Sequence, residues 1–165
     1  MKKSLLIGCF SIAQIFGCTF SVISQSSPET IARLIQQSKP DTSRISLYLE
    51  AAMSYVLRPG SLQSDMDSAR LLVSNALQLN STIKSIEWEG KCFFVYSNIF
   101  REENNNEKGK QYAQKAIEDL ARSGKKLDLA NSYVELARYY DPYNENEVKE
   151  KIKLNEQFGL TNRKY

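Results

Sequence analysis

Apolar and polar positions along the chain follow a helical pattern that recurs at a spacing of 40 residues, for example from Phe93 to Tyr133. Each copy has an aromatic residue, a pair that ends in a small residue, and a second aromatic residue, with two positions between successive features. Because this spacing places all four side chains on one stripe of a helix, each copy predicts an amphipathic helix. The three copies are Tyr48, Ala51, Ala52 and Tyr55; Phe93, Tyr96, Ser97 and Phe100; and Tyr133, Leu136, Ala137 and Tyr140.

A second set of positions repeats at the same spacing and predicts a second helix in the first two copies. It begins 14 residues after Tyr55 but 9 residues after Phe100, and we place the difference in the turn at 58–63. Recurring helix pairs predict antiparallel hairpins stacked along the chain, with Ala76 and Ala116 at close contacts inside them. The aligned positions are Ala69, Leu72, Val73, Ala76 and Leu77, and then Gly109, Tyr112, Ala113, Ala116 and Ile117.

The pattern resembles the tetratricopeptide repeat, a family with an aromatic, a Leu-small pair and a Tyr in its first helix and Ala residues in its second. The period of that family is about 34 residues, so a spacing of 40 implies longer second helices and connections. The resemblance implies an all-α superhelix of about three repeats, at 43–79, 83–121 and 126–158. The second helix of the third repeat is degenerate, with only Val148, Ile152 and Phe158 offering apolar contacts. An unrelated helical bundle is the alternative.

Shorter strings resemble the exported repeat segment that precedes the membrane span in bacterial sensor histidine kinases and related receptors. These strings are 39–45, 67–69, 88–91 and 96–102. The resemblance implies that the chain is the sensory part of a two-component-type signalling receptor, truncated before its kinase. A self-standing scaffold protein of an envelope complex is the alternative.

The N-terminus predicts export. Lys2 and Lys3 precede an apolar run, 5–23, that is interrupted by small and polar residues, as in a secretory signal peptide covering 1–24. We expect the mature chain to be periplasmic, with a short helix and linker at 25–42 and a tail at 159–165. Two alternatives stay open: an uncleaved membrane anchor, and lipidation of Cys18, because Ile15 to Cys18 resembles a lipobox.

Composition argues against catalysis and nucleic-acid binding. The chain has 22 basic and 19 acidic residues, and two of the basic residues belong to the predicted signal, so no concentrated basic surface is expected. Without any His, it lacks the usual triad base and zinc ligand, and we expect neither enzyme activity nor a metal or cofactor. The thiol of Cys92 is expected to fill an apolar core position.

The resemblance also implies a concave groove, lined by the first helices, that binds a peptide or protein. In this groove Arg101 and Arg138 would hold a peptide carboxylate or backbone through forked hydrogen bonds. Ordinary solvated helix positions are the alternative for these residues. The aromatic residues of the repeated pattern are expected in the core, whereas Trp88 either packs or serves as an exposed anchor. The groove residues are Leu49, Met53, Lys91, Phe94, Asn98, Arg101, Asn131, Val134, Arg138 and Asp141.

Overall fold

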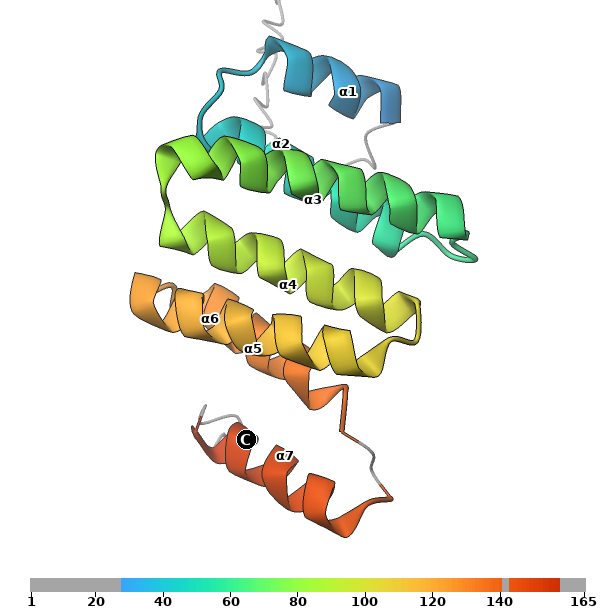
Figure 1. The fold of residues 1–165 in the computed structure, drawn as a ribbon, viewed down its shortest axis with the longest axis vertical. Helices are drawn as coiled ribbons and strands as arrows, with labels where there is room; N and C mark the ends of the chain where they lie inside the picture. The colour runs from blue at the N-terminus through green and yellow to red at the C-terminus, as the bar shows by residue number, and fades with distance from the viewer. Residues whose placement is uncertain (1–27, 141–142, 158–165) are drawn as a thin grey trace, which may run out of the picture.

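The computed structural model describes residues 28–140 and 143–157, and within them the chain is helical, without strands (Figure 1). The fold-class prediction is therefore confirmed at the level of an all-α protein. The predicted signal peptide, Cys18, Asp141 and Phe158 lie outside the described residues. The described helices are α1 (Pro28–Gln37), α2 (Thr42–Val56), α3 (Gln63–Ile83), α4 (Ile86–Glu102), α5 (Asn106–Ser123), α6 (Lys126–Ala137) and α7 (Glu145–Gln157).

Local chemistry fixes the helix ends. The Asp41 carboxylate accepts a hydrogen bond from the backbone N–H of Ser43 at 2.8 Å and so caps α2. Gly124 ends α5 in the left-handed conformation, with φ of 73°. At the end of α3, Lys84 adopts the same conformation and Asn80 binds the backbone of Ser85. Helix α3 therefore continues to Ile83, beyond the predicted end of the first repeat at 79, and α4 begins at Ile86 rather than at 83.

Each helix packs against its neighbour in the chain, and alternate helices also meet. The hairpins α2–α3 and α4–α5 have the most extensive contacts; α3 also packs on α4, and α5 on α6. In addition, α2 contacts α4 and α4 contacts α6, so α4 lies at the centre of the molecule. Helix α1 packs on α2, and within the described ranges α7 packs on α6 alone.

The main core is built by α2, α3 and α4. Ile45, Val73 and Ile99 are completely buried there, together with small residues that allow the helices to approach closely. The two alanines expected inside the hairpins, Ala76 and Ala116, are both completely buried. The buried members of the main core are Ile45, Leu49, Ala52, Val56, Met66, Ala69, Val73, Ala76, Cys92, Val95 and Ile99.

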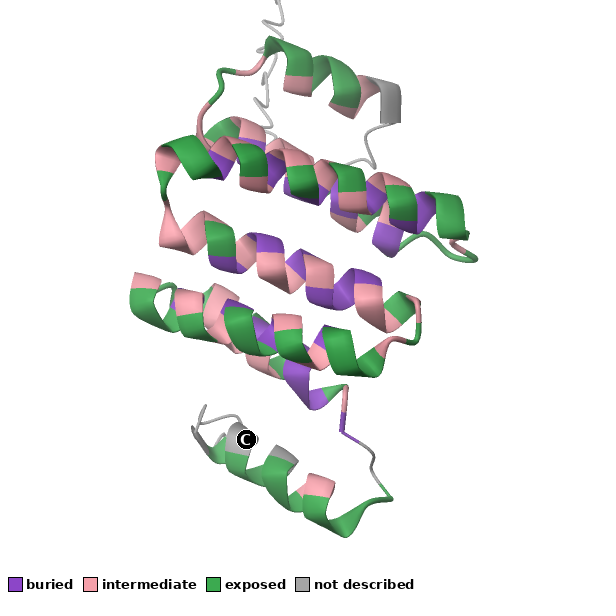
Figure 2. Ribbon diagram, viewed as in Figure 1, coloured by how far each residue is buried: buried purple, intermediate pink, exposed green. Residues whose placement is uncertain are grey.

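The C-terminal part has a much smaller core. Its buried members are Ala113, Leu136 and Tyr140, with Ile117 and Tyr139 packed against them. The described side chains of α7 are largely exposed, as the burial colours of Figure 2 show, and Ile152 keeps 47% of its surface accessible. The poor apolar content seen in this part of the sequence therefore corresponds to sparse packing.

Candidate functional site

Helices α2, α4 and α6 form the surface on which the sequence places a groove, and we call it the α2–α4–α6 surface. Between α2 and α4 it carries a depression of about 460 Å³. Between α4 and α6 it carries ion pairs and hydrogen bonds. The depression is lined by Thr42, Ser43, Ser46, Leu47 and Glu50 of α2 and by Trp88 of α4.

Trp88 stands between the depression and the charged part of this surface. Its ring is half-buried and packs against the main core while also lining the depression. The ammonium group of Lys91 lies 4.3 Å from the centre of the ring. A cation at this distance from an indole face is attracted by the ring quadrupole, so Trp88 and Lys91 hold each other in place.

Two carboxylates surround Lys91. Its ammonium group is 2.8 Å from Glu87 and 3.3 Å from Asp128, which belongs to α6. Glu87 also forms an ion pair with Lys125, with 3.2 Å between the carboxylate oxygen and the ammonium nitrogen. Burial by itself would raise the pKa of Glu87, but the hydrogen bonds from Lys91 and Lys125 outweigh it and lower the pKa below its ordinary value. Burial would likewise lower the pKa of Lys91, yet its bonds to Glu87 and Asp128 raise it. Both shifts favour the charged forms of Glu87 and Lys91.

A buried glutamate lies further along α6. Glu135 is only 2% exposed. One of its carboxylate oxygens accepts hydrogen bonds from Arg101 of α4 at 3.1 Å and from Arg138 at 3.0 Å. Burial raises the pKa of Glu135 even though both guanidinium groups act in the opposite direction. A carboxylate of this chain thus occupies the two arginines that were predicted to bind a ligand carboxylate.

Tyr139 locks α6 against α4 and α5. Its hydroxyl donates to the backbone oxygen of Ser97 at 2.6 Å and lies 2.9 Å from the Ser97 Oγ. Burial raises the pKa of Tyr139 to about 12. The ring covers Gly109 so closely that a Cβ at that position would overlap it, which explains why α5 has glycine there.

The other predicted groove residues divide between core and solvent. Asn98 is 2% exposed; it donates to the backbone oxygen of Phe94 at 2.8 Å and accepts from Arg101. Met53 and Phe94 are half-buried against the main core, and Leu49 is inside it. Asn131 and Val134 are exposed on α6. The structure therefore joins Lys91 with Trp88 and Arg101 with Arg138, whereas the remaining described residues serve packing or face solvent.

Sequence reasoning missed Glu87, Asp128, Glu135 and Tyr139. A signal for Glu135 was present, because Ser132, Glu135 and Leu136 share one stripe of α6 and a carboxylate beside a predicted core position such as Leu136 needs a partner. Arg138, three residues later, is one such partner. The partner on α4 depends on how the helices stack, which no local pattern reveals.

This surface is equipped for binding, since it offers an aromatic ring beside fixed charges of both signs. In the described residues no group of three or more His, Cys, Asp or Glu side chains is placed to hold a metal ion. Burial raises the pKa of the Cys92 thiol to about 12, with Glu89 adding to the effect, so this thiol is not a ready nucleophile. None of the described helices has the length and apolar character that crossing a membrane would require.

Comparison of the chain with protein-family models, curated proteins and solved structures found no match.

Proposed function

We propose that the chain is a non-enzymatic, tetratricopeptide-like repeat module that binds a peptide or protein segment on its α2–α4–α6 surface. The observation that carries this proposal is the depression between α2 and α4, with Trp88 at its wall and Lys91 over the Trp88 ring. Partly buried tryptophan next to charged groups is typical of the anchor points of protein interfaces. The depression gives an incoming side chain a place beside the indole.

The charges along α4 and α6 favour a partner with both charged and apolar side chains. Arg138 directs one nitrogen to Glu135 and its side chain remains 53% exposed, so it retains donors for a ligand carboxylate. Arg101 divides its donors among Glu135, Asn98 and Glu102 and is 21% exposed. Of the two arginines, we assign ligand contact to Arg138 and the support of Glu135 to Arg101. Val134 on α6, which is 43% exposed, provides an apolar contact for the partner.

The cellular setting of the proposal comes from the sequence. A signal-like N-terminus favours an exported, periplasmic module, and the resemblance to receptor segments favours a sensory role in two-component-type signalling. The alternative is an envelope scaffold attached to the membrane through lipidated Cys18. Mass spectrometry of the protein purified from cells decides between these settings: a chain beginning near Gln25 supports periplasmic release, an acylated Cys18 supports the scaffold, and an intact Met1 contradicts export.

The binding proposal is tested with peptides selected from a random display library on the full chain. Trp88→Ala and Arg138→Ala should each weaken a selected peptide about tenfold, as expected for the loss of an interface anchor. Leu71→Ala, at an exposed position of α3, is the control and should leave affinity unchanged. A selection in which no peptide is weakened by Trp88→Ala or by Arg138→Ala would overturn the proposal.

A further inference from the structure

A second surface, formed by α3, α4 and α5, carries a cluster of aromatic rings that the proposed function does not use. We call Phe93, Tyr96, Phe100 and Tyr112 the aromatic strip. Tyr112 of α5 lies against all three rings of α4, with centroid distances of 5.9 Å to Phe93, 5.2 Å to Tyr96 and 5.3 Å to Phe100. All four side chains are half-buried, so part of each ring remains accessible.

Cations from two helices lie over this strip. Lys115 is 5.1 Å from the centre of Tyr112, and Lys108 and Arg70 are each 5.5 Å from that of Phe100. Arg70 is paired with Glu103. By contrast, Lys108 and Lys115 are exposed, and within the described part of the chain neither has a carboxylate within 4.0 Å. Their charge is therefore available to a ligand.

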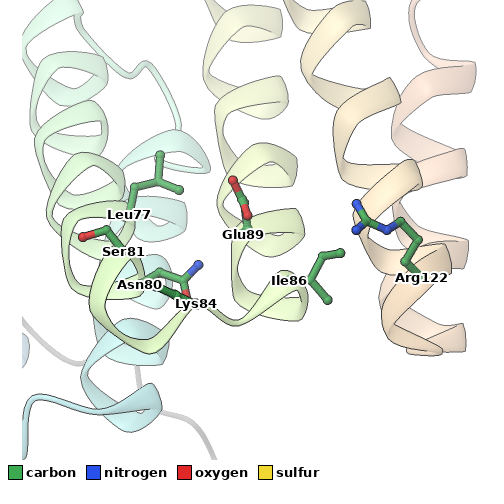
Figure 3. A pocket seen from close by; sticks show the side chains of 7 residues that line it. All are labelled: Leu77, Asn80, Ser81, Lys84, Ile86, Glu89 and Arg122. Carbon is green, nitrogen blue, oxygen red and sulfur yellow. The ribbon is translucent and has the colours of Figure 1, made fainter.

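A pocket of about 450 Å³ lies between the same three helices (Figure 3). Leu77 and Ser81 line it from α3, Glu89 from α4 and Arg122 from α5, whose guanidinium is directed toward α4. Arg122 is 71% exposed and pairs with Asp119 at 3.5 Å. The full lining is Leu77, Asn80, Ser81, Lys84, Ile86, Glu89 and Arg122, which includes two cations and two apolar side chains.

The pocket and the aromatic strip form one continuous surface. On α4, Ile86 and Glu89 of the pocket share a stripe with the strip residues, because the steps Ile86, Glu89, Phe93, Tyr96 and Phe100 are three or four residues each. On α5, Lys108, Tyr112, Lys115 and Arg122 follow the same periodicity. From Ile86 to Phe100 the rise of α4 is about 21 Å, the length of about six residues of extended chain.

We propose that this surface binds an acidic, partly apolar peptide segment of a partner protein in extended form. The segment's carboxylates meet Lys84, Lys108 and Lys115 and the positive edges of the rings, while an apolar side chain enters the pocket beside Leu77 and Ile86. The carboxylates of Glu89 and Glu103 interrupt the positive charge. Such an interruption suits a peptide with spaced charges and opposes the continuous phosphates of a nucleic acid.

The test uses a fluorescent peptide of twelve residues with alternating glutamate and phenylalanine, titrated against the full chain by fluorescence anisotropy. Combining Lys108→Glu with Lys115→Glu should weaken binding about tenfold or more, because two attractive charges become repulsive. The matched control combines Lys126→Glu with Lys153→Glu, which changes net charge equally at exposed positions of α6 and α7. The control should bind like the unaltered protein, and circular dichroism checks that both variants stay folded.

The proposal is independent of the α2–α4–α6 surface, so Arg138→Ala should leave this binding unchanged. Equal weakening in the Lys108/Lys115 variant and its control would mean nonspecific charge attraction and would overturn the proposal. Undiminished binding in the Lys108/Lys115 variant, or its loss in Arg138→Ala, would also overturn it. A peptide with glutamine in place of glutamate should bind more weakly than the acidic peptide, and a single-stranded oligothymidine should not bind more tightly than it. If either result is reversed, the surface does not select an acidic peptide and the proposal is overturned.

Discussion

The two sides of α4 are joined to the rest of the molecule in different ways. Toward α2 and α3 the contact is apolar, with Leu49, Ala52, Val95 and Ile99 buried. Toward α6 it is made largely of ion pairs and hydrogen bonds that involve Lys91, Ser97 and Arg101, although Glu135 on α6 is as buried as the apolar residues. Apolar packing needs no matched charges, whereas the polar junction is stable only while its buried carboxylate keeps a cationic partner.

The largest expected difference comes from truncating one buried side chain on each side. Ile99→Ala should lower the free energy of unfolding by about 2 to 5 kcal/mol, because a completely buried methyl-rich side chain leaves a cavity. Leu136→Ala should lower the free energy of unfolding by an amount near the lower end of the same range of about 2 to 5 kcal/mol, because the few side chains around Leu136 can move to fill the cavity. Urea denaturation followed by circular dichroism measures both, and equal losses would contradict the distinction.

Breaking the ion pair of Glu135 should have the next largest effect. Arg101→Ala leaves a buried carboxylate with one guanidinium fewer and should cost about 1 to 3 kcal/mol. Adding Glu135→Leu should restore much of this loss, because an apolar group of similar volume needs no partner. Arg138→Ala is the control at a more exposed position and should cost less. Additive effects of Arg101→Ala and Glu135→Leu would show that the pair is not coupled.

Measurements at alkaline pH should distinguish the two sides of α4, because each side holds one group whose pKa is raised to about 12: Cys92 toward α2 and α3, and Tyr139 beside α6. For Cys92 and Tyr139 the folded-state pKa exceeds the unfolded value, so their contribution is present at lower pH and is lost as pH rises. Cys92 starts from 9.0 and Tyr139 from 10.0. Each therefore adds a slope of up to about 1.4 kcal/mol per pH unit above its unfolded pKa.

Cys92→Ala should consequently flatten the loss of stability from pH 9.0 upward, and Tyr139→Phe should flatten it only above pH 10.0. Chemical denaturation at half-unit steps of pH gives the free energy of unfolding against pH. Subtracting the curve of the unaltered protein removes the contribution of the other tyrosines, which both proteins share. Loss of the hydrogen bonds to Ser97 lowers the whole Tyr139→Phe curve, so only a slope that already differs below pH 10.0 would contradict the assignment.

The smallest effect should come from the exposed end of the charged network. Lys125 is 51% exposed, so Lys125→Ala should change the free energy of unfolding by no more than about 1 kcal/mol, and salt should reduce the difference further. Thermal melts at low and high salt measure this change. A loss comparable to that of Arg101→Ala would mean that the network is more strongly coupled than its exposure implies.

Much of the helical architecture could be predicted from sequence, because helix stripes and turn residues are local. The small residues at 69, 76, 109 and 116 are buried as the repeated spacing suggested. The surroundings of the candidate groove residues could not be predicted, since periodicity shows which way a side chain points but not what lies across from it. Asn98 points toward the backbone of its own helix, and Arg101 meets a carboxylate 34 residues away. Such partners depend on the distance and angle between helices.

Helix α7 has consequences for how the molecule bears load. Among the described helices it contacts only α6, and its described side chains are mostly exposed, so tension applied to it meets few contacts acting together. The helix would peel away turn by turn at low force, while α2, α3 and α4 remain closed around the main core. A tether attached at this end would therefore lengthen by one helix before strain reached the packed helices α2, α3 and α4.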